Sequence, residues 1–470
     1  KLEQLATALN KHLDKINAID LSKNIDIKDA YVYGPLYLLE RLIEDYGIKD
    51  MLNFIVKQHK RLQFDFEKIV FTLIASRFIQ PMSKLCLWEN MLDKLYPEMV
   101  NTDISLQHIY RSLDLLCEHK DYIEKKLFYH KKDLFNSDVD VILYDLTTLR
   151  FESTREDLSD LARMGYSKEK RNDCTQVVLG LVTDTDAIPI SFDVYPGNTF
   201  EGSTLNGLVD KLRNKFNIRR FIFVADRGLF SESNLNHIRK DGGEFIVGLK
   251  IGSLKKEFKD DMYDISRFQF VNDDFAIYQT KKGTDRCIIT WSKSRAERDR
   301  NNREDIIKKI QEKLQAQKVT DKKFITNRGY QKYIITDGQS RPELNKKAIE
   351  EDVKQDGFFG IITNVSEDKM SAEEVIKNYK HLWMVEDAFG EIKGTLATRP
   401  MFHWTDNRII GHITLCFLTY FCEAQLTKAL RKANVVLESK AIDKKLIKPR
   451  PLSTVQAIRE LNTVLAIPVE

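Results

Sequence analysis

Cysteine is scarce in this sequence of 470 residues, and none of its six cysteines forms a Cys-x-x-Cys pair. This pattern argues against a zinc site and implies no disulfide framework, so we expect a reducing, cytoplasmic setting. No run approaches the roughly 18–20 uninterrupted apolar residues that span a bilayer. Residues 1–15 also lack the apolar core of a signal peptide. We therefore expect a protein that works away from the membrane.

An excess of one charge is absent too, because 74 basic and 70 acidic residues leave a net charge of only +4. The total charge therefore does not indicate nucleic-acid binding, and local clusters must carry that case. There is no GxxxxGK[ST] phosphate loop, and no Ser–His–Asp or Cys–His arrangement stands out. With 42% apolar and 10% aromatic residues, the chain has the composition of a globular protein with a sizeable core.

Helical patterns dominate residues 1–136, where apolar residues recur three and four apart and Pro81 interrupts one run. From residue 137 the period changes to that of strands. The segments that follow predict the order β-β-β-α-β-α-β, with strands in 138–153, 175–196 (two), 219–228 and 243–250, and helices in 203–216 and 231–242. This order is that of the ribonuclease H-like fold, an α/β mixed sheet flanked by helices.

The remaining segments suggest an interrupted catalytic domain. Residues 250–365 read as a mixed insertion with several short strands and a charged helix in 294–318, which we interpret as a solvated surface helix. A capping-box pattern at Ser371 opens the second part of the domain, residues 366–434, whose final apolar helix we expect to be buried. The predicted units are 1–136, 137–249, 250–365, 366–434 and a C-terminal tail, 435–470.

Two carboxylates stand at the ends of apolar runs, Asp145 after VILY and Asp226 after FIFVA. Each has an ordinary explanation: an Asx turn with Thr147 and Thr148 for Asp145, and a salt bridge to Arg227 or a helix N-cap for Asp226. If the predicted strand order is right, however, the two strands are neighbours and the carboxylates meet. Carboxylates held close repel each other unless a divalent cation lies between them.

Such a pair predicts phosphoryl chemistry. Mg²⁺ takes oxygen ligands and commonly uses one or two carboxylates together with phosphate oxygens. Two ions about 3.5–4 Å apart favour in-line displacement at phosphorus. Spacing alone leaves the acid–base chemistry of glycoside hydrolysis as an alternative.

Glu386 is the third candidate carboxylate. Tyr379, Leu382, Glu386, Phe389 and Lys393 fall on one face of a predicted helix, where a mixture of polar and apolar residues is unusual for core packing. A solvated Glu–Lys face is the alternative interpretation.

With these residues in place, the sequence resembles the DDE transposases of bacterial insertion sequences, in the cut-and-paste group that has a Tyr-x2-Arg-x3-Glu-x6-Lys signature. Tyr379, Glu386 and Lys393 match that spacing, whereas Leu382 stands at the Arg position. YDLT, ADRG, YPGNT and the RP of TRPMFHW also resemble motifs of this family, and the resemblance covers residues 137–425. Asp145 and Asp226 are 81 residues apart and Asp226 and Glu386 are 160 apart, and relatives carry a β-rich insertion in the longer interval.

The resemblance implies that Asp145, Asp226 and Glu386 bind two Mg²⁺ or Mn²⁺ ions and catalyse DNA cleavage and strand transfer. The expected partners are double-stranded DNA with terminal inverted repeats and target DNA, bound by a homodimer that pairs the two ends. The N-terminal helices would recognise the repeats, although they show no clear helix-turn-helix. The protein would be bacterial and would associate with the nucleoid when bound to DNA. The expected DNA contacts are Tyr379, Lys393, Arg227, Arg399, His403 and Arg408.

The sequence contains three further candidate segments for DNA contacts. The loop with Asn198, Thr199 and Ser203 is equally well explained as a strand-to-helix turn, and the loop around Trp404 could instead anchor the last helix. The basic run Lys444–Leu452 could contact the DNA backbone. Two other functions also remain open: a catalytically inactive DNA-binding regulator, and a ribonuclease H-like nuclease without strand transfer.

Overall fold

The computed structural model describes most of the chain in eleven stretches: residues 29–100, 103–131, 140–166, 173–216, 221–229, 231–240, 242–254, 256–315, 331–335, 342–437 and 450–467. Two compact units are present. One comprises Lys1–Ser112 and Ala429–Glu470, and the other comprises Leu113–Lys428. The domain boundaries expected from the sequence divide the chain differently, because the C-terminal tail belongs to the same unit as the N-terminal helices.

A nine-stranded sheet with the order β4-β3-β2-β5-β6-β12-β9-β8-β7 forms the centre of the larger unit. The five strands β2 (Asp140–Arg150), β3 (Gln176–Thr183), β4 (Pro189–Pro196), β5 (Phe221–Ala225) and β6 (Glu244–Leu249) occur with α8 (Leu205–Phe216) and α9 (Glu232–Arg239) in the predicted order. The first three strands are antiparallel, while β2, β5 and β6 run parallel. The predicted mixed sheet of a ribonuclease H-like fold is confirmed.

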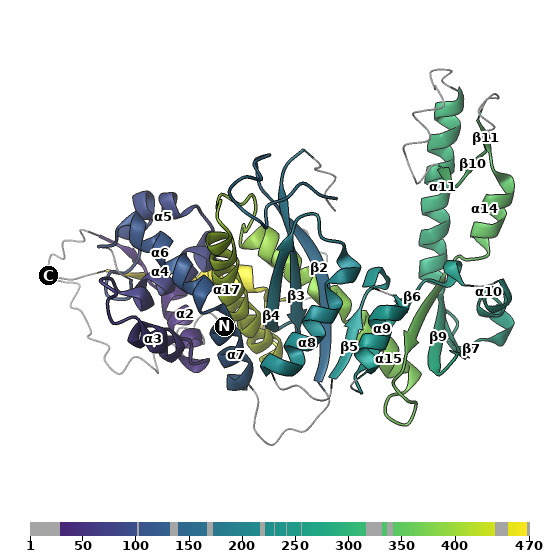
Figure 1. Cartoon of the computed structure of the whole chain (residues 1–470), viewed down its shortest axis with the longest axis horizontal. Coiled ribbons are helices and arrows are strands. Elements are labelled where there is room, and N and C mark those ends of the chain that lie inside the picture. Colours follow the sequence, from purple (N-terminus) through teal and green to yellow (C-terminus); the bar gives the residue numbers. More distant parts are fainter. Residues whose placement is uncertain are drawn as a thin grey trace, which may run out of the picture. The chain divides into compact units, whose positions relative to one another are not determined.

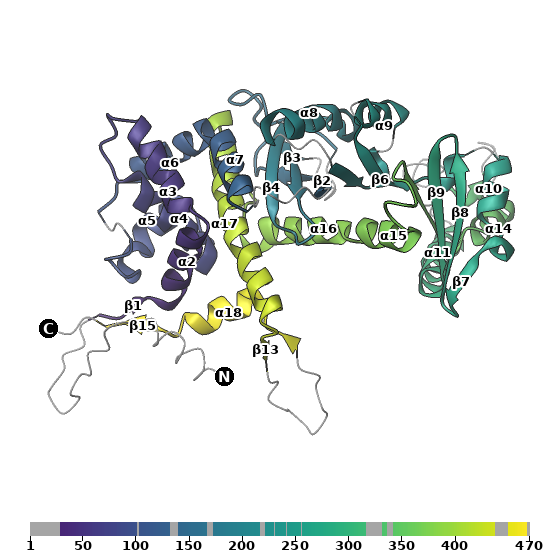
Figure 2. The ribbon, with the colours of Figure 1, turned by 90° about the horizontal axis from the view of Figure 1, so that it is seen from below.

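Helices cover both faces of these strands. The helices α8 and α9 lie on one face, and α15 (Ala372–Lys380) and α16 (Leu382–Gly390) lie on the other (Figure 2). Side chains alternate between the faces, so Ile142, Tyr144 and Leu146 join the core that includes α8 and α9. The residues between them on β2, including Asp145, point towards the face with α15 and α16.

The insertion continues the same sheet. The strand β12 (Phe358–Thr363) pairs with β6 on one side and with β9 (Asp285–Ser292) on the other, and β8 (Phe275–Lys282) and β7 (Gln269–Asn272) follow. The long helix α11 (Lys293–Gln315) packs beside β10 (Ile334–Ile335), β11 (Glu343–Leu344) and α14 (Lys346–Val353) (Figure 1). Its face with Ile310 is buried against Tyr333, so only part of this charged helix is a solvated surface. The short helix α10 (Lys256–Met262) precedes these strands.

The last apolar helix, α17 (Asp406–Lys432), is the one described helix long and apolar enough to cross a membrane. However, 94% of its most apolar stretch is buried inside the protein, as in the core helix of a folded domain. The expectation of a buried helix is therefore confirmed.

The smaller unit is helical, as predicted. It contains α2 (Gly34–Asp45), α3 (Ile48–Gln58), α4 (Phe66–Ile79), α5 (Lys84–Asn90), the first part of α6 (Leu106–Glu118) and α18 (Thr454–Leu461). The predicted break at Pro81 follows the end of α4. The strand β1 (Tyr31–Val32) pairs with β15 (Leu465–Ala466), which ties the two ends of the described chain together. Most of the basic run Lys444–Leu452 lies outside the described residues.

A buried carboxylate joins α7 (Lys120–Lys131) to the sheet. Glu124 is fully buried, accepts hydrogen bonds from Ser191 Oγ and Phe192 N at 3.0 Å each, and forms ion pairs with three lysines, Lys120, Lys211 and Lys215. Burial alone would raise the pKa of Glu124, but the three positive charges lower it to about 2. One carboxylate thus holds α7, β4 and α8 together.

Glu124→Gln should therefore lower the free energy of unfolding of the larger unit, Leu113–Lys428, by about 3–5 kcal/mol at neutral pH. The reason is that the three lysines lose their buried counter-charge. The pKa of Glu124 falls from an ordinary 4.5 to about 2 on folding. Its contribution is therefore complete above pH 4.5 and is lost as the pH falls through about 2. Urea unfolding at a series of pH values measures both effects.

The matched control is Asp121→Asn. Asp121 pairs with Lys215 as well, but its side chain is 80% exposed, so the free energy of unfolding should change by less than about 1 kcal/mol. Equal losses in the two variants would contradict the role given to Glu124.

Candidate active site

The parallel pairing of β2 with β5 brings the first two candidate carboxylates together. Tyr144 is in register with Ala225, so the next residues along the two strands are Asp145 and Asp226. Neighbouring strands lie about 4.8 Å apart. The sequence-based prediction that these strands are adjacent is confirmed.

Asp145 follows the apolar run VILY but lies inside its strand, in agreement with the strand predicted over 138–153. The strand β2 continues to Arg150, and Thr147 and Thr148 are buried within it. The alternative of an Asx turn at this position is therefore wrong. The Asp145 carboxylate accepts a hydrogen bond from Leu146 N at 2.8 Å and is half-buried.

Asp226 is held by a tyrosine rather than by its neighbouring arginine. Tyr379 Oη donates a hydrogen bond to Asp226 Oδ1 at 3.1 Å. Burial and the negative charge of Asp226 raise the pKa of Tyr379, so the phenol keeps its proton. Arg227 forms no ion pair with Asp226 among the described residues, and the salt-bridge alternative is not supported. The nearby helix α9 is capped by Ser231 rather than by Asp226.

Gly248 on β6 leaves room for this tyrosine. A Cβ atom at position 248 would lie 2.6 Å from Tyr379 Oη and 3.1 Å from Arg227 N. The first distance is shorter than a Cβ atom tolerates and the second is tight, so a side chain here would displace the donor to Asp226. The sequence analysis missed this glycine, because a single glycine inside an apolar strand does not reveal what lies above it.

Glu386 lies on the helix that covers Asp145. The helix α16 packs against β2 and β3, on the face towards which Asp145 points, and the Glu386 side chain is exposed. The single helix expected over 371–396 is interrupted, because α15 ends at Lys380 and the π-helix η6 (Glu391–Thr395) follows α16. The seven-residue spacing of Tyr379, Glu386 and Lys393 therefore does not by itself place all three on one face. The capping box at Ser371 is present as predicted.

The other predicted DNA contacts are not gathered at one place. Arg399 is half-buried, and Met401 N, two residues on, donates to Arg150 O at 3.0 Å, which places this loop beside the end of β2. His403 is only 7% exposed, with its ring 4.8 Å from that of His412, so this structure does not present it to DNA. Arg408 pairs with Asp114 at 3.5 Å.

In the loop after β4, the Ser203 hydroxyl donates to Phe200 O at 2.7 Å. This hydrogen bond is part of a local turn, so it favours the interpretation of Ser203 as part of a strand-to-helix turn rather than as a DNA contact. Asn198 in the same loop is exposed.

The insertion contributes residues that the sequence analysis missed. The Phe359 ring on β12 lies 5.2 Å from the Tyr379 ring, and the Arg295 guanidinium lies 4.8 Å from the centre of the Phe359 ring. Arg295 stands in a helix with several other arginines, and no sequence pattern distinguishes it from them. Only the pairing of β12 with β6 brings α11 next to Tyr379.

The donor chemistry of the site fits divalent cations. Its three candidate ligands are carboxylates, and Asp226 and Glu386 form no ion pair within the described part of the chain. Negative charge that no protein cation neutralises, presented by oxygen ligands, is the arrangement that Mg²⁺ or Mn²⁺ prefers.

The sheet, its two neighbouring aspartates and the overlying glutamate define the class of protein. The family model described as "Transposase DDE domain" matches residues 136–422, which is more than half of the chain. The chain therefore belongs to the DDE-domain transposase family, whose members generally use divalent metal ions.

Among solved structures, the chain is similar to the piggyBac transposase in a synaptic complex with hairpin DNA. The TM-score is 0.41 and the sequence identity 10%, and the similarity covers 92% of this chain and 80% of that one. No curated protein matches the sequence.

Gly248→Ala should strongly reduce metal-dependent DNA cleavage while leaving the protein folded, because the new Cβ pushes Tyr379 away from Asp226. The cleavage rate and the thermal unfolding temperature should be measured together. Gly207→Ala on α8 is the matched control, since a Cβ there meets no atom within 4 Å. Full activity of Gly248→Ala would show that the contact between Tyr379 and Asp226 is dispensable.

Proposed function

We propose that this chain is a cut-and-paste transposase of a bacterial insertion sequence, which cleaves DNA at the ends of the element and joins them to target DNA. The observation that carries the proposal is the register of β2 and β5, which sets Asp145 beside Asp226 under the helix that bears Glu386. The family supports transposase activity, and the match of Tyr379, Glu386 and Lys393 to the signature spacing supports this group within it.

In this proposal Asp145, Asp226 and Glu386 hold two Mg²⁺ or Mn²⁺ ions. Such ions, when bound, supply the Lewis-acid chemistry of in-line displacement at phosphorus. The protein residues orient the ligands. Leu146 N fixes one oxygen of Asp145, and Tyr379 Oη fixes one oxygen of Asp226. These hydrogen bonds hold the two carboxylates in a defined direction, as a rigid metal site requires.

Two cations near the carboxylates are the proposed contacts to DNA phosphates. Arg227 directly follows Asp226 and is exposed, and Lys393 lies one helical segment beyond Glu386. Cations that contact phosphates position DNA without reading its sequence. We assign recognition of the terminal repeats to the N-terminal helices and expect a homodimer to pair the two ends.

The decisive experiment incubates the full chain with DNA that flanks its own coding sequence, where the terminal repeats are expected, and with a target plasmid. Joined products should form with Mg²⁺ and should be absent with EDTA. Asp145→Asn, Asp226→Asn and Glu386→Gln should each abolish cleavage and joining, because each removes a charged ligand of the metal ions. Gel electrophoresis of the products gives the measurement.

Glu373→Gln is the matched control, because Glu373 is an exposed carboxylate on α15 that precedes the signature residues. It should join DNA at the wild-type rate. Cleavage without joining would indicate a nuclease, and binding without either reaction would indicate a regulator. Normal activity in Glu386→Gln would remove that residue from the active site.

A further inference from the structure

A cavity of about 400 Å³ opens beside the proposed active site, between the end of β6, the strand β12 and the helix α11. Arg227, the residue that follows Asp226, is part of its wall, which places the cavity one residue along the chain from a proposed metal ligand. Its volume falls within the range of ligand pockets, about 300–1,000 Å³. The predicted functions of the three carboxylates do not use it.

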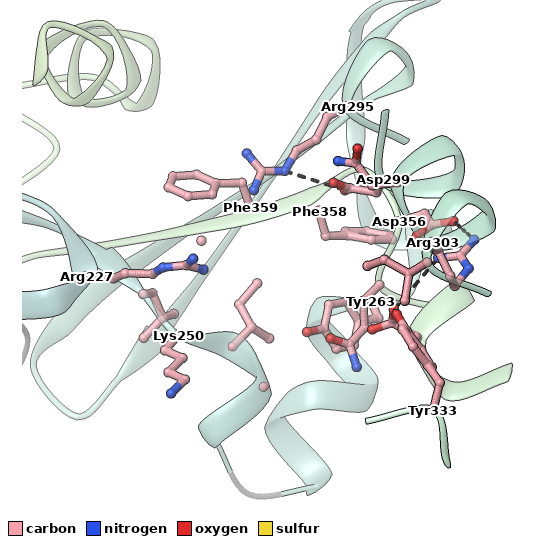
Figure 3. A pocket seen from close by; sticks show the side chains of 18 residues that line it. Arg227, Lys250, Tyr263, Arg295, Asp299, Arg303, Tyr333, Asp356, Phe358 and Phe359 are labelled. Carbon is pink, nitrogen blue, oxygen red and sulfur yellow. Dashed lines mark hydrogen bonds and ion pairs between the residues drawn. The ribbon is translucent and has the colours of Figure 1, made fainter. Parts of the chain in front are cut away.

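The acidic side of this cavity is neutralised by the protein itself. Arg303 donates two hydrogen bonds to Asp356, at 2.5 and 2.6 Å, and Asp352 is paired with Lys332 and Tyr333. Arg303, Asp356 and Tyr333 lie together at one side of the cavity in Figure 3. Because their charges are already paired, they offer little attraction to a cationic ligand.

The opposite side of the cavity carries Arg227 and Arg295, which have fewer acidic partners than Arg303 has. Arg227 forms no ion pair within the described residues. Arg295 forms one long ion pair, with its Nε atom 3.8 Å from a carboxylate oxygen of Asp299, and this buried Nε atom makes no hydrogen bond among the described residues. Figure 3 shows the Arg227 and Arg295 side chains on the same side of the cavity, with Phe359 next to Arg295.

The two guanidinium groups are close enough to repel each other. Burial lowers the pKa of Arg295, Asp299 opposes that change, and the positive charges of Arg298 and Arg227 lower the pKa further. Two arginines that face one cavity with a buried donor to spare are a ready site for an anion. Planar guanidinium groups bind phosphate oxygens with paired hydrogen bonds, and an anion between them relieves the repulsion.

We propose that Arg227 and Arg295 together hold one phosphate of the DNA strand that enters the active site. This inference rests on the proposed function and extends it, because it assigns a DNA contact to the insertion. Leu382 stands where the signature has an arginine and carries no charge. The cation next to Tyr379 comes instead from α11, since Arg295 stacks on Phe359 and Phe359 contacts the Tyr379 ring.

The test measures the affinity of the full chain for a duplex from the flank of its coding sequence at several salt concentrations, in EDTA so that no DNA is cut. One phosphate contact contributes about 0.9 to the slope of log affinity against log salt concentration. The double variant Arg227→Gln/Arg295→Gln should lose about that amount, and its affinity at low salt should fall about tenfold or more. Arg300→Gln is the control, because Arg300 is exposed on the same helix but does not line the cavity.

A scan with single methylphosphonate linkages, which are uncharged, locates the phosphate. One linkage should weaken binding by the wild-type protein but should not weaken binding by the double variant any further. Arg227→Gln alone changes an exposed side chain, so it tests the site even if the double variant does not fold. It should lower both the affinity and the slope.

Three outcomes would overturn the inference. An unchanged slope in the double variant would mean that the arginines touch no phosphate, and a slope lowered by about twice the value for one contact would mean two separate phosphates. An equal loss in Arg300→Gln would mean a diffuse effect of charge. If the wild-type protein joins DNA in Mg²⁺ while one of these outcomes occurs, the proposed function stands and only this inference fails. A wild-type protein that neither binds nor joins DNA contradicts both.

Discussion

The parallel pairing of β2 with β5 is the constraint on which the proposed active site depends. Once Tyr144 is in register with Ala225, Asp145 and Asp226 must stand next to each other at a strand separation of about 4.8 Å. Two carboxylates at this separation repel each other, and a slip by one residue would turn one of them into the core with α8 and α9. The apolar residues on either side of Asp145 and the apolar run before Asp226 prevent that slip, because the core fixes which face each residue takes. The hydrophobic pattern thus holds in place a charge arrangement that is unfavourable without a cation.

The second constraint is the path of α15 and α16 across the sheet. These helices lie on the face opposite α8 and α9, so they pass over Asp145 and Asp226 (Figure 2). Tyr379 reaches down to Asp226 because Gly248 leaves the space above β6 open. The break at His381, between α15 and α16, lets Tyr379 point at β5 while Glu386 lies over β2. The interrupted segment of α15 and α16 therefore places one side chain at the end of β5 and another over β2.

The sequence predicted most of this sheet for a physical reason. The strands around Asp145 and Asp226 are apolar and are separated by clear turns or amphipathic helices, and local patterns of that kind are what a sequence reveals. The strand predicted over 138–153 contains β2 in full, but an Asx turn at Thr147 and Thr148 stayed open as an alternative until the pairing with β3 showed both threonines buried inside the strand. The burial of His403 was missed for a similar reason, since its neighbour His412 lies on another element. Contacts between segments that are far apart in the sequence decide whether such residues are buried. A single sequence does not show which segments make those contacts.

The insertion shows the same limit most clearly. The charged sequence of its helix α11 suggests a solvated surface helix. The position of this helix is nevertheless fixed by the hydrogen bonds of the nine-stranded sheet. The strand β12 is paired along its length with β9, which leads directly into α11, and also with β6, which ends beside Arg227. Arg295 in the first turns of α11 is therefore held at a defined distance from Asp226, which a loop could not ensure. A cation placed by a sheet in this way needs no signature in the sequence around Glu386, and this is consistent with a leucine at position 382.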